Sequence, residues 1–263
     1  MNASIEIRTT EKPAFPMPAS IKDTYKSVDP RVALHDHMAT SNITAYYQVG
    51  ASALTIIQTS IALGCMPAPE QILDFACGAG RVTRWLRAAY PESTVSGSDL
   101  READIDFHRK ILGTNMWKSE ERISNIKPPN KYDLIWVGSL LSHLSEQDAL
   151  AAMHAFMNWL KPNGILVVSF HGRRAQLGQT MRQARYISDS KFKLIEQDYF
   201  EKGYGYAPYD NQPTLGMSLI KPNWFFMLAE SKMAWKILGV FEAAWADHHD
   251  VCTIQNKPVC VPI

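Results

Sequence analysis

The chain of 263 residues has little cysteine, almost no net charge and no long apolar run. Its four cysteines form no C-x-x-C pair and no His/Cys metal spacing, which argues against a disulfide framework and indicates reduced thiols in a cytosolic protein. The 27 basic and 26 acidic residues nearly cancel, so the positive surface typical of nucleic-acid binding is not expected. Polar residues interrupt the most apolar stretch, 49–66, and we therefore expect no membrane span.

The amino-terminal residues also lack a basic segment followed by an apolar core, the pattern of a secretory signal, so we expect a cytoplasmic protein. Internal repeats and low-complexity tracts are absent as well. The length fits one α/β domain with accessory segments. The sequence leaves the oligomeric state open.

What the chain does contain is a glycine turn between a buried strand and a helix, in residues 72–81. A second strand is predicted over 94–98 and ends at Asp99. Gly78 and Gly80 can adopt backbone angles denied to other residues and let a ligand approach bare main chain. A carboxylate at the end of the neighbouring strand, here Asp99, can accept hydrogen bonds from both hydroxyls of a ribose. The unit therefore predicts a nucleoside site.

The spacing of the glycines separates two classes of ligand. A dinucleotide fold needs a third small residue, and Thr83 stands at that position, which disfavours a nicotinamide-dependent oxidoreductase. The pattern D-x-x-x-G-x-G that begins at Asp74 instead resembles the first motif of the class I S-adenosylmethionine-dependent methyltransferases.

Two later segments extend this resemblance in the same order along the chain. Residues 131–144 resemble the fourth strand of that family and the turn after it. Residues 160–170 resemble its L-K-P-G-G turn and fifth strand, with Asn163 in place of the first glycine. Asparagine tolerates left-handed backbone angles better than most residues, so this exchange is mild.

The resemblance implies an α/β, three-layer, Rossmann-like fold. We expect a seven-stranded sheet with helices on both faces and an antiparallel seventh strand, preceded by an N-terminal helical arm. Residues 214–220 and 235–245 are candidates for the sixth and seventh strands, and a further strand-like segment follows at 251–255. The predicted division is an arm and helical lid over 1–66 and a methyltransferase domain with C-terminal substrate-facing segments over 67–263, together one compact domain.

Within the arm, the prolines among the first thirty residues predict a mostly irregular chain. Leu54, Ile57 and Ile61 then mark one face of a helix that ends near Gly64.

The resemblance also implies S-adenosylmethionine as the cofactor and a set of residues that bind it. Tyr47 has an equally weighted alternative role, the packing of the arm, and Arg81 has the alternative of a solvated surface side chain. Either Ser119 or Glu120 follows the third strand, where the family contacts adenine, and Ala76 departs from the family's glycine. The expected cofactor-binding residues are Tyr47, Asp74, Ala76, Cys77, Gly78, Gly80, Arg81, Asp99, Leu100, Ser119, Glu120, Gly138 and Ser139.

Methyl transfer depends mainly on holding the acceptor in line with the methyl group, so a general base is optional. His143, after the fourth strand, is the first candidate for a base or an acceptor-orienting group, and His171, after the fifth strand, is the second. A structural role is the alternative for each. The segment His248–Asp250 suggests a metal, but adjacent histidines project in different directions, so we favour a structural role and expect no metal.

The nature of the acceptor can be narrowed in part. The turn after the fourth strand lacks the N-P-P-Y or D-P-P-Y motif of methyltransferases that act on DNA amino groups or protein glutamine. The aromatic segment 199–209, with Trp224, Phe225 and Phe226, favours a small or partly apolar acceptor, and a hydrophobic core is the alternative for these rings. The sequence thus predicts methyl transfer to a small molecule, with oxygen favoured. A protein or peptide methyltransferase and a non-catalytic regulatory protein that binds S-adenosylmethionine remain alternatives.

Overall fold

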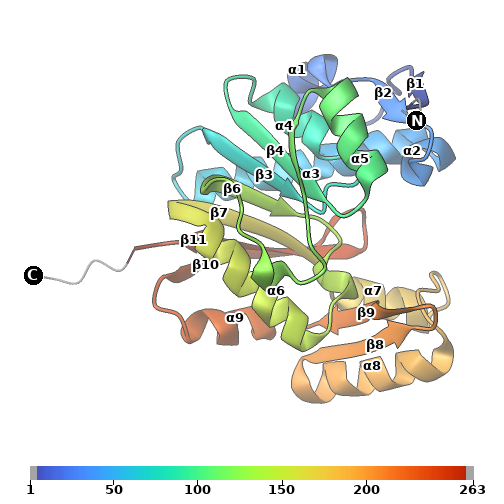
Figure 1. Cartoon of the computed structure of the whole chain (residues 1–263). Helices are drawn as coiled ribbons and strands as arrows, with labels where there is room; N and C mark the ends of the chain where they lie inside the picture. Colours follow the sequence, from blue (N-terminus) through green and yellow to red (C-terminus); the bar gives the residue numbers. More distant parts are fainter. Residues whose placement is uncertain (1–4, 259–263) are drawn as a thin grey trace, which may run out of the picture.

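A seven-stranded sheet forms the middle layer of the computed structural model, which describes residues 5–258 (Figure 1). Its order is β10-β11-β7-β6-β3-β4-β5. The strands β3 to β7 pair in parallel, whereas β11 pairs antiparallel with both β7 and β10. The strands are β3 (Gln71–Phe75), β4 (Thr94–Asp99), β5 (Asn115–Lys118), β6 (Tyr132–Val137), β7 (Leu160–His171), β10 (Trp235–Trp245) and β11 (His249–Asn256).

Helices cover both faces of this sheet, which is why its central strands are apolar on both sides. On one face, residues of α3 pack with β3, β6 and β7 in one core cluster, and on the other, residues of α6 and α9 pack with the same strands. Figure 1 shows α4 and α5 above the sheet and α6 and α9 below it. Their bounds are α3 (Ile43–Leu63), α4 (Thr83–Ala89), α5 (Glu102–Phe107), α6 (Glu146–Trp159) and α9 (Pro222–Glu230). The predicted three-layer α/β fold is confirmed.

The predicted strand assignment near the C-terminus is partly wrong. Residues 214–220 lie in β9 (Gln212–Ile220), which pairs only with β8 (Tyr204–Tyr209) in a hairpin outside the main sheet. The sixth strand is β10, and the segment 251–255 belongs to β11, the antiparallel seventh strand. An apolar alternating segment predicts a strand, but its pairing partner depends on contacts distant in sequence.

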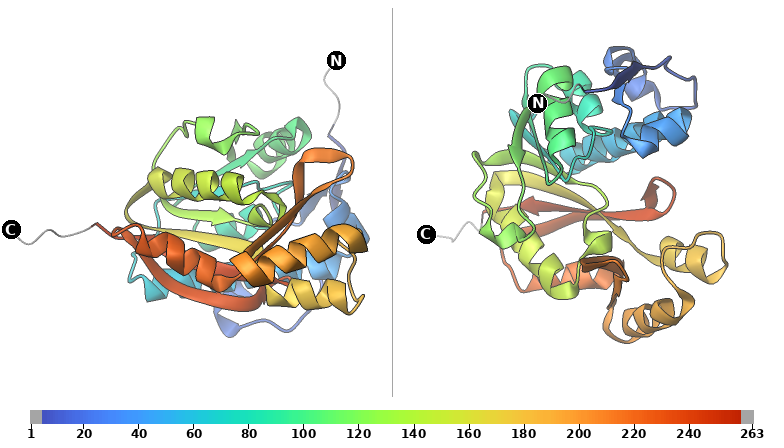
Figure 2. Two further views of the ribbon diagram at one scale, coloured as in Figure 1. Left: turned by 90° about the horizontal axis from the view of Figure 1, so that it is seen from below. Right: turned by 45° about the vertical axis from the view of Figure 1, so that its right-hand side comes forward.

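The hairpin belongs to a lobe beside the sheet that also contains α7 (Arg173–Thr180) and α8 (Asp189–Lys202). A separate cluster of buried apolar side chains joins these elements. Figure 2 shows this yellow-to-orange lobe projecting from the end of the sheet. Trp224 and Phe225 of α9 are instead buried in the main core, so the core alternative holds for these two rings, whereas Phe226 is exposed.

Residues 5–30 are more regular than the sequence predicted. They contain β1 (Ile7–Thr9) and α1 (Ala19–Ser27), and β1 pairs with β2 (Arg31–Ala33) in a small sheet, before α2 (His37–Ser41). The prolines lie outside these elements or at their ends, which is why their density did not exclude a helix. The helix predicted to end near Gly64 is α3, for which Gly64 is the C-cap. The division at residue 66 stays a prediction.

Among the residues that the structure describes, no helix is long and apolar enough to cross a membrane. Cys65, Cys77 and Cys252 are free thiols, and Cys260 lies outside the described residues.

Candidate functional site

The parallel sheet brings the carboxyl ends of β3, β4, β6 and β7 to one edge. Because β11 runs antiparallel to β7, its first residue, His249, lies at the same edge and pairs with His171. In open α/β sheets, ligands bind outside the carboxyl ends of the strands. The glycine turn, Asp99 and the candidate histidines are therefore brought to one side of the sheet.

In the glycine turn after β3, alternate residues have a left-handed conformation. The φ angles are +57° at Ala76, +53° at Gly78 and +85° at Gly80. Ala76 has a left-handed conformation, which an alanine adopts less readily than the family's glycine, so this departure costs some backbone strain. A β-carbon at Gly78 would meet only the guanidinium of Arg101, at 3.5 Å, so this face of the turn is open to a ligand.

Gly80 is also required for a reason that the sequence did not suggest. A β-carbon there would lie 2.7 Å from Leu112 Cδ1 and 3.1 Å from the ring of His108. The protein's own π-helical turn, His108–Leu112, thus fills the space beside Gly80. Packing of the chain, in addition to any ligand, excludes a side chain at this position.

Asp99 connects β4 to the glycine turn. Its Oδ2 accepts a hydrogen bond from the Gly78 amide at 2.8 Å, and its Oδ1 accepts one from the Arg101 amide at 3.0 Å. An ionised carboxylate has about four acceptor positions, so two bonds leave capacity for ligand hydroxyls. Leu100, the next residue, is 47% exposed, a large apolar side chain uncovered beside this carboxylate.

Asp74, at the start of the motif, is buried beneath the turn. Its Oδ2 accepts a hydrogen bond from the Thr83 hydroxyl at 2.6 Å. Burial raises the pKa of the Asp74 carboxyl to about 7, and the bond from Thr83 opposes this shift. Thr83, which breaks the dinucleotide pattern, therefore has a positive role as the partner of Asp74.

Two residues that support the turn were missed in the sequence. His108 Nε2 lies 3.0 Å from the Gly78 carbonyl oxygen, and burial lowers the pKa of this histidine to about 4. The neutral ring therefore donates to that carbonyl, and Cys77 Sγ, also buried, lies 3.6 Å from the same nitrogen. Arg84 is 1% exposed and donates to the carbonyls of Gly80 and Asp29. Neither residue belongs to the motif, so only the tertiary contacts identify them.

Arg81 lies between the turn and the end of β10. Its guanidinium stacks over the Trp245 ring at 5.0 Å and is close enough to Asp74 to influence the pKa of that carboxyl. Within residues 5–258, Arg81 makes no side-chain hydrogen bond or ion pair, so its cation is available to a carboxylate ligand.

Tyr47 does not have the position predicted for a cofactor cover. The side chain has no exposed surface, its hydroxyl is 3.1 Å from Thr10 Oγ1, and its ring packs edge-on against Tyr25. These contacts fix the arm against α3 and leave no ring face for a ligand, so the alternative role, packing of the arm, holds in this structure.

The remaining expected cofactor residues follow the neighbouring strands. Ser119 is buried and its amide donates to the Asp99 carbonyl, whereas Glu120 is exposed. After β6, Gly138 and Ser139 are half-buried, and the Ser139 amide donates to Ser169 Oγ at 2.8 Å. Ser139 also has a left-handed φ of +57°, so the chain turns sharply at the edge where ligands bind.

His143 and His171 lie together at this edge, with ring centroids 6.3 Å apart. His143 Nδ1 is 3.0 Å from the Gly216 carbonyl oxygen and 3.1 Å from the Tyr209 hydroxyl, both in the hairpin. Since a carbonyl can only accept, Nδ1 carries the hydrogen and Nε2 carries the lone pair. Burial lowers the pKa of His143, which keeps the ring neutral.

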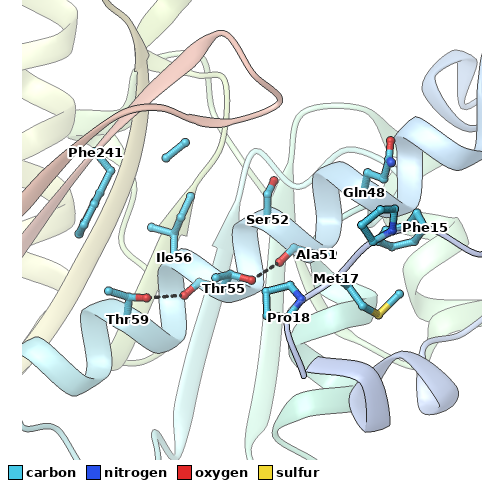
Figure 3. Close-up of a pocket in the computed structure, with 12 residues that line it drawn as sticks. Phe15, Met17, Pro18, Gln48, Ala51, Ser52, Thr55, Ile56, Thr59 and Phe241 are labelled. Atoms are coloured by element: carbon cyan, nitrogen blue, oxygen red, sulfur yellow. Dashed lines mark hydrogen bonds between the residues drawn. The ribbon is translucent and has the colours of Figure 1, made fainter. Parts of the chain in front are cut away.

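A pocket lies elsewhere in the structure, beside the N-terminal arm. It measures about 490 Å³ and is lined by the arm (Phe15 to Pro18), α3 (Gln48 to Thr59) and β10 (Phe241 and Ala244), as Figure 3 shows. The chemical groups described above are not part of its lining.

Comparison with known proteins agrees with this geometry. Residues 72–164 match the family model of a methyltransferase domain. The chain is 29% identical over 110 residues to a malonyl-[acyl-carrier protein] O-methyltransferase from Halalkalibacterium halodurans, covering 40% of each chain. It is 28% identical over 101 residues to an N-terminal Xaa-Pro-Lys N-methyltransferase 2 from Danio rerio, covering 36% of each. The matches thus span well under half the length of these curated relatives.

The fold has a wider match. An S-adenosylmethionine-dependent methyltransferase from Clostridium acetobutylicum superposes with a TM-score of 0.56 at 15% identity, covering 84% of this chain and 97% of that one. The strand order with its antiparallel seventh strand, the glycine turn with its acidic partner, and the matched domain lead to one assignment. Residues 72–164 match a methyltransferase domain, and the described chain has the Rossmann-like α/β fold seen in an S-adenosylmethionine-dependent methyltransferase.

Proposed function

We propose that this chain binds S-adenosylmethionine across the glycine turn and transfers its methyl group to a small-molecule acceptor, with oxygen as the favoured accepting atom. The observation that carries the proposal is that the candidate cofactor-binding and catalytic residues lie at the same edge of the sheet. Asp99, Arg81 and the candidate base His143 all lie at the carboxyl ends of the parallel strands.

The residues present fit this cofactor. Asp99 has acceptor capacity for the ribose hydroxyls, and the exposed Leu100 offers an apolar surface to the adenine. The Arg81 cation, which has no ion-pair partner among residues 5–258, suits the methionine carboxylate, and the buried Asp74 carboxyl suits a neighbouring positive charge. Gly78 leaves the space between them free of a side chain. When bound, the cofactor supplies an electrophilic methyl group on a sulfonium.

The acceptor would lie between the turn after β6 and His171. His143 is oriented by the Gly216 carbonyl so that Nε2 can accept the proton of an acceptor hydroxyl. With the cofactor bound as the source of the methyl group, His143 Nε2 would accept the proton that the acceptor hydroxyl loses. The lobe of α7, α8 and the hairpin packs against this end of the sheet, and helps to exclude water from it.

Two measurements test the proposal. Calorimetry should detect one S-adenosylmethionine per chain and no binding of NAD, and the reverse result would refute it. Incubation of the purified chain with a methyl-labelled cofactor and a cell extract should then yield a labelled small molecule, identified by mass spectrometry.

A peptide acceptor is the second candidate, because the Danio rerio relative is named as a methyltransferase of peptide N-termini. Peptides that begin with Xaa-Pro-Lys should be included in the same assay. Label in a peptide amine, with none in the small-molecule fraction, would favour this alternative. Tight cofactor binding with no labelled product from either source would favour a regulatory role.

A further inference from the structure

Three histidines from distant parts of the sequence come together beside the proposed acceptor site. They are His171 at the end of β7 and the adjacent pair His248 and His249 at the start of β11. One ring nitrogen of each lies within 4.8 Å of the others. We propose that these three imidazoles bind a divalent transition-metal ion of the zinc class.

Strand register explains why the cluster forms. His249 is the direct antiparallel partner of His171, so their side chains stand side by side on one face of the sheet. Their ring centroids are 4.5 Å apart. His248 lies in the turn before the strand. Its ring centroid is 4.4 Å from that of His249. The sequence argument that adjacent histidines diverge therefore fails here, because the turn changes the direction of the first one.

Asp250, the third member of the sequence cluster, has a different environment. Its Oδ1 accepts a hydrogen bond from the Ala243 amide at 2.8 Å, and its Oδ2 approaches the backbone of Gly172. Strand alternation turns it to the opposite face from His249. The ligand set is therefore three imidazoles without a carboxylate, which suits zinc, cobalt or nickel and does not suit magnesium or calcium.

The hydrogen bonds of the cluster agree with a metal site. His171 and His249 are 3% and 4% exposed, and the Nδ1 atom of each has no hydrogen-bond partner in the described part of the chain. A buried polar atom without a partner is costly, and a metal ion would provide one. His248 Nδ1 donates to the Ala246 carbonyl oxygen at 2.7 Å, which leaves the lone pair on Nε2, and such outer bonds orient metal-ligating histidines.

The distances between the three imidazole nitrogens can reach those of a zinc site by side-chain movement alone. Around a tetrahedral zinc with Zn–N bonds of about 2.0–2.1 Å, ligand nitrogens lie about 3.3 Å apart. The upper limit of 4.8 Å can be reduced to this by rotation of the rings, since all three project from one end of the sheet.

The position of the cluster suggests what the ion would do. His249 lies 5.1 Å from Trp245, the ring that Arg81 covers, and His171 neighbours His143. Three ligands leave a fourth coordination position, and half-buried His248 gives access to it. An acceptor oxygen bound there would be held close to the methyl group and would lose its proton more easily. This role rests on the proposed function, whereas binding of the ion does not.

The test uses the full chain, stripped with a chelator and dialysed against Zn²⁺ or Co²⁺. We expect one equivalent of Zn²⁺ with a dissociation constant in the micromolar range or below, and visible absorption typical of four-coordinate Co²⁺. His171→Ala and His249→Ala should each weaken binding at least tenfold. His154→Ala, which removes a half-buried histidine of α6 away from the cluster, should leave it unchanged.

Folding is controlled by circular dichroism and by S-adenosylmethionine titration of each variant. If the buried variants do not fold, His248→Ala and the metal-induced shifts of the His171 and His249 ring nitrogens in NMR spectra decide the question. Absence of stoichiometric binding, or equal binding by the cluster variants and His154→Ala, would overturn the proposal. Cofactor binding without metal binding refutes only this inference, and metal binding without cofactor binding refutes only the proposed function.

Discussion

The two halves of the sheet edge differ in how their chemistry is built. At β3 and β4, the groups that would bind the cofactor lie close together in sequence and are fixed by backbone hydrogen bonds, such as Asp99 to the Gly78 amide. At β6, β7 and β11, the candidate catalytic groups come from segments far apart, and they meet only through strand pairing and the hairpin lobe. We infer that the residues around β3 and β4 bind a cofactor that many such proteins share. The residues around β6, β7 and β11 would determine which acceptor this protein methylates.

The largest effect should come from the acceptor half. Replacement of His143 by alanine removes the nitrogen proposed to take the acceptor proton, and general-base assistance is typically worth about 10²–10⁴ in rate. We expect turnover to fall by such a factor while S-adenosylmethionine affinity stays within about twofold, measured by labelled-methyl assay and calorimetry. Equal loss of cofactor affinity would instead place His143 in the nucleoside pocket. The division of the sheet edge into a cofactor half and an acceptor half would then be wrong.

Substitution of Gly80 in the glycine turn should lower both the stability of the protein and its affinity for the cofactor. Gly80→Ala forces a left-handed residue to carry a β-carbon 2.7 Å from Leu112, so strain and overpacking should together cost about 2–4 kcal/mol. The melting temperature and the cofactor affinity should both fall. Gly178→Ala is the matched control, because a β-carbon there meets only Ala184, at 3.8 Å, and the helix should tolerate it. Similar behaviour of the two variants would contradict the packing argument.

Asp99 should affect binding more selectively. Asp99→Ala removes an acceptor of ribose hydroxyls and a partner of the Gly78 amide, at a cost of roughly 1.5–3 kcal/mol, or about tenfold to a hundredfold in affinity. Asp133→Ala provides the control. Asp133 also accepts two backbone amide bonds, from Glu70 and Gln71, but it lies at the opposite edge of the sheet. This variant should lose stability and, where folded, keep wild-type affinity for the cofactor in calorimetry.

The same contrast explains how far the sequence could predict the structure. The glycine turn, Asp99 and the parallel strands follow from patterns within about thirty residues, where local propensity and spacing suffice. The histidine cluster could not be found in this way, because His171 and His249 meet only when β11 pairs with β7. The sequence did not identify His108 and Arg84 as supports of the glycine turn for the same reason, since only tertiary packing directs them to it. The strand at 214–220 was assigned to the wrong sheet because periodicity does not specify a partner.

The smallest predicted effect is a dependence on pH within the cofactor half. The pKa of the Asp74 carboxyl is raised to about 7 by burial, so the folded protein holds this proton more tightly than the unfolded chain. Its contribution to the free energy of unfolding is therefore full below about pH 4 and is lost as the pH rises through 7. A positively charged ligand reverses the preference, because it favours the ionised carboxylate.

S-adenosylmethionine carries two positive charges near the expected position of Asp74, so its affinity should rise between pH 6 and pH 8, by at most about tenfold per unit of pKa shift. Calorimetry across this range, in buffers of different ionisation enthalpy, should detect release of a proton at pH 6. Asp74→Asn keeps an oxygen that can accept from Thr83 but cannot ionise, so its affinity should be lower at pH 8 and nearly independent of pH. A wild-type affinity that does not change with pH would mean that the cofactor's charges lie away from Asp74, and that Arg81 and Asp99 define the site without it.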